Sequence, residues 1–569
     1  MSGLSGLGCA GSLLGVYLRT TQRRNADGST VRYVQLAHNV WDPVKQRSTA
    51  HVVHTFGRED RLDRDALARL AGSIGRFLDP EQAQASTTTP ELSFVGSAPM
   101  GGAFLLDALW SRLGVPAAIA TACEGRRLDP GVERVLFTLV ANRALAPTSK
   151  LAALEWARQD VHLPGVTDLG DDPQVFYRAM DFLLQADTKI QESVFFAVAN
   201  LLNLAVDVLL FDTTSTYFET EDDDDFRRYG KSKDHRPDRP QTVIGLAVTR
   251  EGIPVRVWSW PGNAADTTVI RQVHDELRDW SLHRVLWVGD RGFASAENRV
   301  HLQRAGGHVL FAEKLRGVTD NQIALARAGR YRFVSDSLHV KEVWVGGGAS
   351  RRRFIIARNL SEAARDLATR TRHLERLKVE LAAIEPKTGD ARLAAEGALL
   401  AHPVLRRYLT RRNARLVIDT KAVRAEEKLD GKYLLSCTDD NIAAADAAQL
   451  YKSLLEAERS FRDLKQVLEL RPVYHRLEQR IRAHITLCYL ALMLIRVAEN
   501  ATGTPWPVIA RTMDRMHAGN FTGPAGRVTQ RTETTPEQRT ILRALHIPEP
   551  AILLDHDLSP QVTAPRRTA

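Results

Sequence analysis

Three acidic residues stand where a carboxylate can do chemistry. Asp212 follows the apolar run VLLF and Asp290 follows VLWVG, so each is expected at the end of a buried strand. Glu458 lies in YKSLLEAERSFRDLK, where Tyr451, Glu458 and Lys465 recur every seven residues and therefore share one face of a helix. Carboxylates on rigid elements suit hard divalent cations. Each motif alone also fits a plainer role, because an aspartate after a strand is most often a turn or cap residue and a charged helix is often just solvated.

The apolar pattern predicts the elements that position these acids. A buried strand at 205–215 is followed by a hairpin of strands at 242–250 and 254–260, and then by a helix at 266–280. A strand at 284–290, a helix at 294–305 and a strand at 308–314 complete the series. Three antiparallel strands, a helix and a strand beside the first describe a ribonuclease H-like order, an α/β fold with a mixed sheet.

The remaining segments are expected around this core. Residues 1–95 predict a small antiparallel sheet and a helix at 63–78, a candidate for DNA binding, and residues 96–200 predict an all-helical region that is a candidate for binding DNA ends. The core itself would consist of residues 201–314 and 431–500, the second part holding long helices at 444–468 and 477–500. Between them, residues 315–430 predict an insertion of strands and a helical hairpin. Residues 501–569 predict a C-terminal tail in which only short helices form.

Composition narrows the class of protein. The chain has 569 residues, of which 44% are hydrophobic and 25% charged, which excludes a largely disordered protein. Its net charge of +9 favours a polyanionic partner such as nucleic acid. Four cysteines without a C-x-x-C pair form neither a zinc ribbon nor a disulfide framework and fit a reducing cytosol. The start of the chain lacks the basic region of a secretory signal, and the most apolar run, residues 485–495, is too short to cross a bilayer.

Taken together, the motifs resemble a DDE transposase of a bacterial insertion sequence, in the branch with a Tyr-x2-Arg-x3-Glu-x6-Lys signature. The spacing is intact at Tyr451, Glu458 and Lys465, but Leu454 stands where the signature has arginine. The blocks at Asp212 and Asp290, and those at residues 142–157 and 480–492, also resemble blocks of this family in the same order. The likeness runs from about residue 15 to residue 500.

The resemblance implies a cytoplasmic, nucleoid-associated enzyme that cleaves double-stranded DNA at transposon ends and joins the 3′-hydroxyls to target DNA. It implies that Asp212 bridges two Mg²⁺ ions while Asp290 and Glu458 hold one each, with Mn²⁺ able to substitute. Tyr451 and Lys465 would orient the scissile phosphate. Leu454 would lose the phosphate contact of the signature arginine, which Arg459 or Arg462 is expected to supply. Pairing of two ends implies a homodimer on DNA, with no membrane and no small-molecule cofactor.

Other charged runs are weighed against a surface role. The acidic run of residues 219–225 is interpreted as a solvated loop rather than a metal site, and the basic stretch RRYGKSKDHRPDR after it is a candidate for touching DNA near the active site. Trp344 is expected in the core, and His475 and His484 are expected to be structural. Two arginine clusters are predicted to bind phosphate: Arg351, Arg352 and Arg353, and Arg406, Arg407, Arg411, Arg412 and Arg415.

Two alternatives stay open at this point. A ribonuclease H-like DNA nuclease without strand transfer would use the same three acids. A non-catalytic DNA-binding derivative of a transposase is disfavoured by the intact carboxylates and slightly favoured by Leu454.

Overall fold

A computed structural model describes residues 16–24, 30–42, 47–78, 92–126, 131–166, 168–204, 206–280, 282, 285–304, 306–523 and 526–557. The chain forms two compact units. The first consists of Met1–Leu105, Gln159–Pro164 and Val508–Ala569, and the second of Leu106–Arg158 and Gly165–Pro507. The polar segment expected as a linker before Ser93 lies outside the described residues.

The first unit contains two antiparallel sheets. Strands β1 (Val16–Arg24), β2 (Thr30–Asp42) and β3 (Arg47–Arg58) form the first sheet, and η1 (Glu59–Arg61) and α1 (Arg64–Leu78) follow it, as predicted. The second sheet has the order β18-β17-β16-β4 and is built from β4 (Ser93–Pro99), β16 (His517–Gly523), β17 (Gly526–Arg531) and β18 (Leu553–Asp557). Helix α18 (Pro536–Ala544) lies between β17 and β18 in the sequence and starts with a capping box formed by Thr535 and Gln538.

The expectation that only short helices form after residue 501 is therefore wrong. The sequences of β16 and β17, HAGNFTG and GRVTQR, have few apolar residues and no clear alternation. Strand β16 pairs with β4, which comes from the other end of the chain, so no local pattern reveals the pairing.

The second unit begins with helices, as predicted. Helices α3 (Gly101–Arg112), α4 (Val115–Cys123), α5 (Val132–Leu145), α6 (Lys150–Gln159) and α7 (Gln174–Leu201) precede the large sheet. Helix α16 (Glu478–Thr502) packs against α5 and α7. Helix α17 (Trp506–Asp514) follows it in the sequence, and from Val508 onward it belongs to the first unit. By length and composition α16, and α3 with α4 as a bent pair, could cross a membrane, but 94% of the apolar window of α16 is buried inside the protein. Core packing thus explains its apolar character.

A nine-stranded mixed sheet forms the centre of this unit, with the order β10-β11-β12-β15-β9-β8-β5-β6-β7. Strands β5 (Val208–Tyr217), β6 (Gln241–Val248) and β7 (Pro254–Pro261) are antiparallel, and β8 (Leu286–Gly289) runs parallel to β5 and to β9 (His308–Glu313). Helices α8 (Asp266–Asp279) and α9 (Ala296–Arg304) connect them. This is the strand order expected from the sequence. Buried aromatic side chains such as Phe211, Trp287 and Phe311 fill the core between the sheet and α8.

The segment between Leu315 and Asp430 extends this sheet. Its strands are β10 (Arg332–Ser335), β11 (Leu338–Val345) and β12 (Arg352–Asn359), and β15 (Lys432–Cys437) joins β12 to β9. Helix α10 (Thr319–Ala326) precedes β10. The predicted helical hairpin is confirmed as α11 (Leu360–Ile384) and α12 (Gly389–Ala401). After it come η4 (Leu405–Tyr408), the hairpin β13 (Leu409–Arg412) and β14 (Arg415–Ile418), and α13 (Thr420–Glu427).

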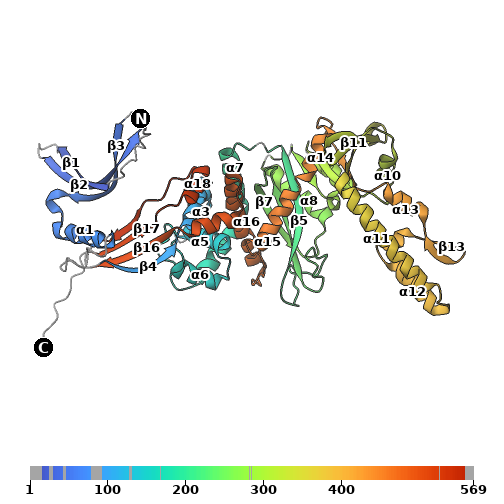
Figure 1. The fold of residues 1–569 in the computed structure, drawn as a ribbon, viewed down its shortest axis with the longest axis horizontal. Coiled ribbons are helices and arrows are strands. Elements are labelled where there is room, and N and C mark those ends of the chain that lie inside the picture. Colours follow the sequence, from blue (N-terminus) through green and yellow to red (C-terminus); the bar gives the residue numbers. More distant parts are fainter. Residues whose placement is uncertain are drawn as a thin grey trace, which may run out of the picture. The chain divides into compact units, whose positions relative to one another are not determined.

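The helix expected over residues 444–468 is broken in two. Helix α14 (Ala444–Lys452) ends before Ser453, and α15 (Leu455–Gln466) starts after Leu454. At the break the backbone N–H groups of Glu456 and Ala457 donate to carbonyls three residues earlier, which tightens the turn. Helix α15 packs on β5 and β6 (Figure 1). The break places Tyr451 and Glu458 on separate helices.

Candidate active site

Asp212 and Asp290 lie next to each other at one end of two parallel strands. The parallel pairing of β5 with β8 ends at Phe211 and Gly289, and each aspartate is the next residue. Strand β5 continues to Tyr217, so Asp212 does not end its strand as expected, but it does stand where this pairing stops. Residues at matched positions on neighbouring parallel strands project their side chains to the same face of the sheet, which brings the two carboxylates together.

Burial raises the pKa of Asp212 to about 6. The ammonium of Lys233 and the backbone N–H of Thr213, which donates to Asp212 Oδ1 at 2.7 Å, oppose the shift, whereas Asp290 and Asp266 add to it. Negative charge is therefore concentrated at a place with little water to screen it. Such a place favours a cation.

Glu458 and Tyr451 join the same cluster from α15 and α14. Glu458 lies in the first turn of α15 and is exposed, and Tyr451 is half-buried with its ring centroid 5.8 Å from that of Tyr433. The pKa of Tyr451 is raised first by burial and then by the charges of Asp290, Glu458 and Asp212. The phenol thus senses all three carboxylates and stays protonated at neutral pH, as a hydrogen-bond donor. The structure brings the predicted acids and Tyr451 together despite the helix break.

Lys465 reaches the cluster from the last turn of α15. Its Nζ donates to Thr214 Oγ1 at 2.7 Å and to Asp234 Oδ1 at 2.8 Å. Thr214 lies two residues after Asp212, and side chains two apart on a strand share a face. Burial lowers the pKa of Lys465, while the bond to Asp234 raises it. The ammonium is thereby fixed on the Asp212 face of β5.

Leu454 and its two candidate substitutes are placed differently. Leu454 is buried at the turn between α14 and α15. Arg459 donates to Glu499 Oε2 at 3.0 Å and lies within ion-pair distance of Glu456 and Asp463. Arg462 is exposed on α15. Of the two arginines, Arg462 is the freer to contact a phosphate.

Sequence reasoning missed Asp266 at the site, and it included Lys233 and Asp234 only as members of the basic stretch RRYGKSKDHRPDR. Lys233 Nζ donates to Thr213 O at 2.7 Å and lies 3.6 Å from Asp266 Oδ2. Thr213 Oγ1 in turn donates to Asp266 Oδ1 at 2.6 Å. The sequence distinguishes neither Lys233 nor Asp234 within that stretch, and Asp266 at the start of α8 looks like an ordinary helix-dipole acid, so the fold is needed to assign their contacts.

The residue types around Asp212 are those that suit a hard divalent cation. Asp290 and Asp266 lie close enough for their charges to raise the pKa of Asp212, and the ammonium of Lys233 compensates part of this negative charge. Oxygen ligands of this kind suit Mg²⁺ and Mn²⁺. Glu458 adds a further, exposed carboxylate on the α15 side.

Another set of metal-ligand types lies on α8 and α9. His274, Asp275 and His301 place their ligand atoms within 4.8 Å of one another. Hydrogen bonds explain the cluster without an ion, because Asp275 Oδ1 lies 2.8 Å from His301 Nε2 and 3.3 Å from His274 Nδ1. The three predicted acids do not belong to it. His475 and His484, expected to be structural, pack ring to ring at 5.5 Å.

The acidic run of residues 219–225 forms an exposed turn, as interpreted from the sequence. Asp224 accepts hydrogen bonds from the backbone N–H groups of Phe226 and Arg227, and Asp225 pairs with Arg228 at 2.7 Å. Asp224 and Asp225 are thus paired within their own turn.

The first arginine cluster is largely committed to the protein. Arg351 stacks on the ring of Trp344 at 3.9 Å, and Arg352 pairs with Glu313 at 2.9 Å. Arg353 is 4% exposed and donates to the carbonyl of Ile442 at 2.8 Å, which favours a structural role. The expectation that Trp344 lies in the core is wrong: it is half-buried near the end of β11, with Arg351 over its ring and its indole N–H donating to Glu342 Oε1 at 3.2 Å.

The second cluster is more open. Arg407 pairs with Glu426 at 3.2 Å and Arg411 with Glu396 at 3.1 Å. Arg406, Arg412 and Arg415 are exposed and form no ion pair with any residue that the structure describes. These three are the side chains of the cluster best able to attract phosphate.

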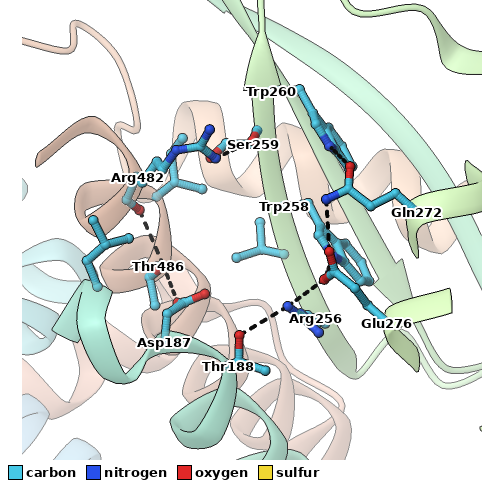
Figure 2. Close-up of a pocket in the computed structure, with 13 residues that line it drawn as sticks. Asp187, Thr188, Arg256, Trp258, Ser259, Trp260, Gln272, Glu276, Arg482 and Thr486 are labelled. Atoms are coloured by element: carbon cyan, nitrogen blue, oxygen red, sulfur yellow. Dashed lines mark hydrogen bonds and ion pairs between the residues drawn. The ribbon is translucent and has the colours of Figure 1, made fainter. Parts of the chain in front are cut away.

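A pocket of about 250 Å³ lies beside β7, away from the three acids, between α7, α8 and α16 (Figure 2). Strand β7 is an edge of the large sheet, and helix side chains satisfy its free backbone groups. Gln191 accepts from the N–H of Val257 at 2.9 Å, Tyr489 donates to Val255 O at 2.9 Å, and Arg482 donates to Ser259 O.

The polar side chains of this pocket are paired with one another. Glu276 accepts from Arg256 at 2.6 Å and from Trp258 at 2.9 Å, and Thr486 donates to Asp187 at 2.8 Å (Figure 2). The pocket therefore serves to cover a sheet edge rather than to carry the chemistry.

Comparison with known proteins agrees with this geometry. A family model of the transposase DDE domain matches residues 206–494, and a model of the N-terminal domain of IS1634 family transposases matches residues 18–86. No curated protein matches the chain. The DDE match contains Asp212, Asp290 and Glu458 and spans half of the chain. The chain therefore belongs to the DDE transposases of bacterial insertion sequences.

Proposed function

We propose that this protein cleaves DNA at the ends of its insertion sequence and transfers the freed 3′-hydroxyls to target DNA, using a ribonuclease H-like core. One observation carries the proposal. After burial, the charges of Asp290, Glu458 and Asp212 all raise the pKa of Tyr451, so three acids from distant parts of the sequence lie near one phenol. Convergence of three acids from distant parts of the sequence is what phosphodiester chemistry with divalent cations needs.

In this proposal Asp212, Asp290 and Glu458 would hold the divalent metal ions. The chemistry that two Mg²⁺ ions supply when bound is activation of the attacking water or 3′-hydroxyl and stabilisation of the leaving oxygen. Asp212 must be ionised for this role, and its raised pKa links that state to pH. Asp266, bonded to Thr213, keeps further negative charge beside Asp212.

Tyr451 and Lys465 would orient the scissile phosphate. The raised pKa of Tyr451 keeps its proton available for a hydrogen bond to a phosphate oxygen. Lys465 presents a point charge on the face of β5 that carries Asp212. Arg462, exposed on the same helix, is the proposed substitute for the signature arginine.

DNA is expected to be attracted by the exposed arginines 406, 412 and 415, by Arg351 on Trp344 and by the small sheet with α1, which overlaps the matched N-terminal domain. Pairing of two ends calls for a homodimer on DNA, in the cytoplasm and at the nucleoid.

The test uses labelled DNA that carries both ends of the element, with and without a target plasmid. The expected result is Mg²⁺-dependent nicking at the ends followed by covalent joining of the 3′ ends to the plasmid. Cleavage without joining would favour the nuclease alternative. Binding of the ends without cleavage, at any Mg²⁺ concentration, would favour a non-catalytic derivative.

A further inference from the structure

The loop between β5 and β6 reaches the active site with two adjacent side chains. Lys233 donates its backbone N–H to Ser215 Oγ at 2.8 Å, and Ser232 Oγ accepts from the N–H groups of Asp234 and Arg236 at 3.2 and 3.0 Å. The backbone of this loop is therefore fixed against β5. Residues Lys233 and Asp234 point to different partners: Lys233 to the carboxylates around Asp212, and Asp234 to cations of the segment that contains α15.

Asp234 bridges two basic residues. Its Oδ1 lies 2.8 Å from Lys465 Nζ, and its Oδ2 lies 3.0 Å from a guanidinium nitrogen of Arg471. The Asp234 side chain is only 8% exposed and that of Lys465 only 11%, so the ion pair between them is not an ordinary surface pair. A buried carboxylate with two cationic partners holds both in defined positions.

The bridge fixes Lys465 relative to the acids. The second hydrogen-bond partner of Lys465 Nζ is Thr214 Oγ1, two residues along β5 from Asp212. Without Asp234, Lys465 would keep one hydrogen bond, to a neutral hydroxyl, and its flexible side chain could leave the face of β5. Arg471 would likewise lose its ion pair and keep only its position over the ring of Tyr217, at 5.3 Å.

We propose that Asp234 is a positioning residue for strand cleavage, which holds the Lys465 ammonium beside Thr214 so that it meets the scissile phosphate. The inference rests on the proposed function, since it assigns the target of Lys465. The proposal predicts different effects of removing Asp234 on DNA binding and on cleavage. A carboxylate beside a DNA site repels DNA, so its removal should not weaken binding even though it disorders the site.

The experiment compares Asp234→Asn with Asp238→Asn in the full-length protein. Asp238 lies in the same loop, is 58% exposed and pairs with Arg236, so its variant makes the same change in charge without touching Lys465. Three quantities are measured: the affinity for labelled element ends, the single-turnover rate of end cleavage in Mg²⁺, and the thermal unfolding temperature.

The proposal expects Asp234→Asn to slow cleavage by about tenfold to a hundredfold, the loss typical of a misplaced catalytic contact, with DNA affinity unchanged or higher. Asp238→Asn should leave the cleavage rate unchanged, and Asp234→Glu should restore part of it. Unchanged cleavage in Asp234→Asn overturns the proposal. So does a parallel fall of cleavage, DNA affinity and unfolding temperature, because that is the result of a merely structural role.

A measurement without DNA separates this inference from the proposed function. The rate at which an amine reagent modifies Lys465, followed by mass spectrometry, should rise in Asp234→Asn and not in Asp238→Asn. If the wild-type protein cuts no DNA, the proposed function fails, and a higher Lys465 reactivity still supports the positioning role. An unchanged reactivity contradicts it in either case.

Discussion

Replacing Asp212 by asparagine should stabilise the metal-free protein while it abolishes cleavage. The pKa of this carboxyl is raised from 3.8 to about 6, and one pKa unit corresponds to about 1.4 kcal/mol. The ionised side chain therefore costs the fold at most about 3 kcal/mol at neutral pH. Asparagine keeps the shape and can still accept the hydrogen bond from the Thr213 N–H, but it carries no charge.

The sign of the pH dependence follows from the direction of the shift. Because the folded pKa lies above the unfolded one, the Asp212 carboxyl favours folding at low pH, and this contribution is lost as the pH rises through about 6. Asp212→Asn should thus exceed the wild type in stability by the full amount above this pH. The difference should shrink to roughly half near pH 5 and close near the unfolded value of 3.8.

The assay is thermal unfolding of both proteins in EDTA across this pH range. For a unit of several hundred residues the expected rise in unfolding temperature is about 3 °C at neutral pH. Mg²⁺ should then stabilise the wild type more than the variant, because binding to the folded state adds stability only where the ligands are complete. A variant less stable than the wild type, or a difference independent of pH, would refute the electrostatic reasoning.

The remaining predictions concern the site and its surroundings. At subsaturating Mg²⁺ the cleavage rate should fall as the pH drops through about 6, because protonated Asp212 binds metal poorly. A higher Mg²⁺ concentration should move the midpoint of this pH profile to lower pH, and a midpoint that Mg²⁺ does not affect would contradict the link. Arg462→Ala should slow cleavage of element ends with little loss of stability. Arg459→Ala should mainly lower stability, because its partner Glu499 is buried. Equal behaviour of the two variants in cleavage and urea unfolding would contradict this distinction. Arg412→Ala should reduce the salt dependence of DNA binding. Arg353→Ala should mainly lower the urea midpoint, because it leaves the Ile442 carbonyl without its donor. A lower urea midpoint in Arg412→Ala together with a smaller salt dependence in Arg353→Ala would contradict the roles given to the two clusters.

Local patterns predicted the central part of the fold. The order of strands from β5 to β9, with β8 beside β5, follows from apolar runs and turn residues that are each readable over a short window. The sheet of β4, β16, β17 and β18 was not predictable in this way, because its strands come from both ends of the chain and lack a strong apolar face. The break between α14 and α15 was also missed, since no proline or glycine marks it.

The candidate site was predicted from the spacing of its residues and from the resemblance of its motifs to those of a family. Asp212, Asp290 and Glu458 carry signals that a sequence can hold: two follow apolar strands and one sits in a seven-residue repeat. Asp234 and Lys233 were predicted only as part of a basic stretch near the active site, because a loop residue gains its particular role from what the fold places beside it. Burial likewise determines which arginines are available to bind phosphate: Arg353 is buried and bonded within the protein, whereas Arg412 is exposed.

The most direct test of the central claim is cleavage of labelled element ends by Glu458→Gln. Glu458 is exposed and lies on the surface of α15, so this isosteric variant should fold and bind the ends as the wild type does. The account predicts that Mg²⁺-dependent nicking is lost while the affinity for DNA ends is retained. Nicking at the wild-type rate by Glu458→Gln would show that Asp212, Asp290 and Glu458 do not act together as the catalytic acids.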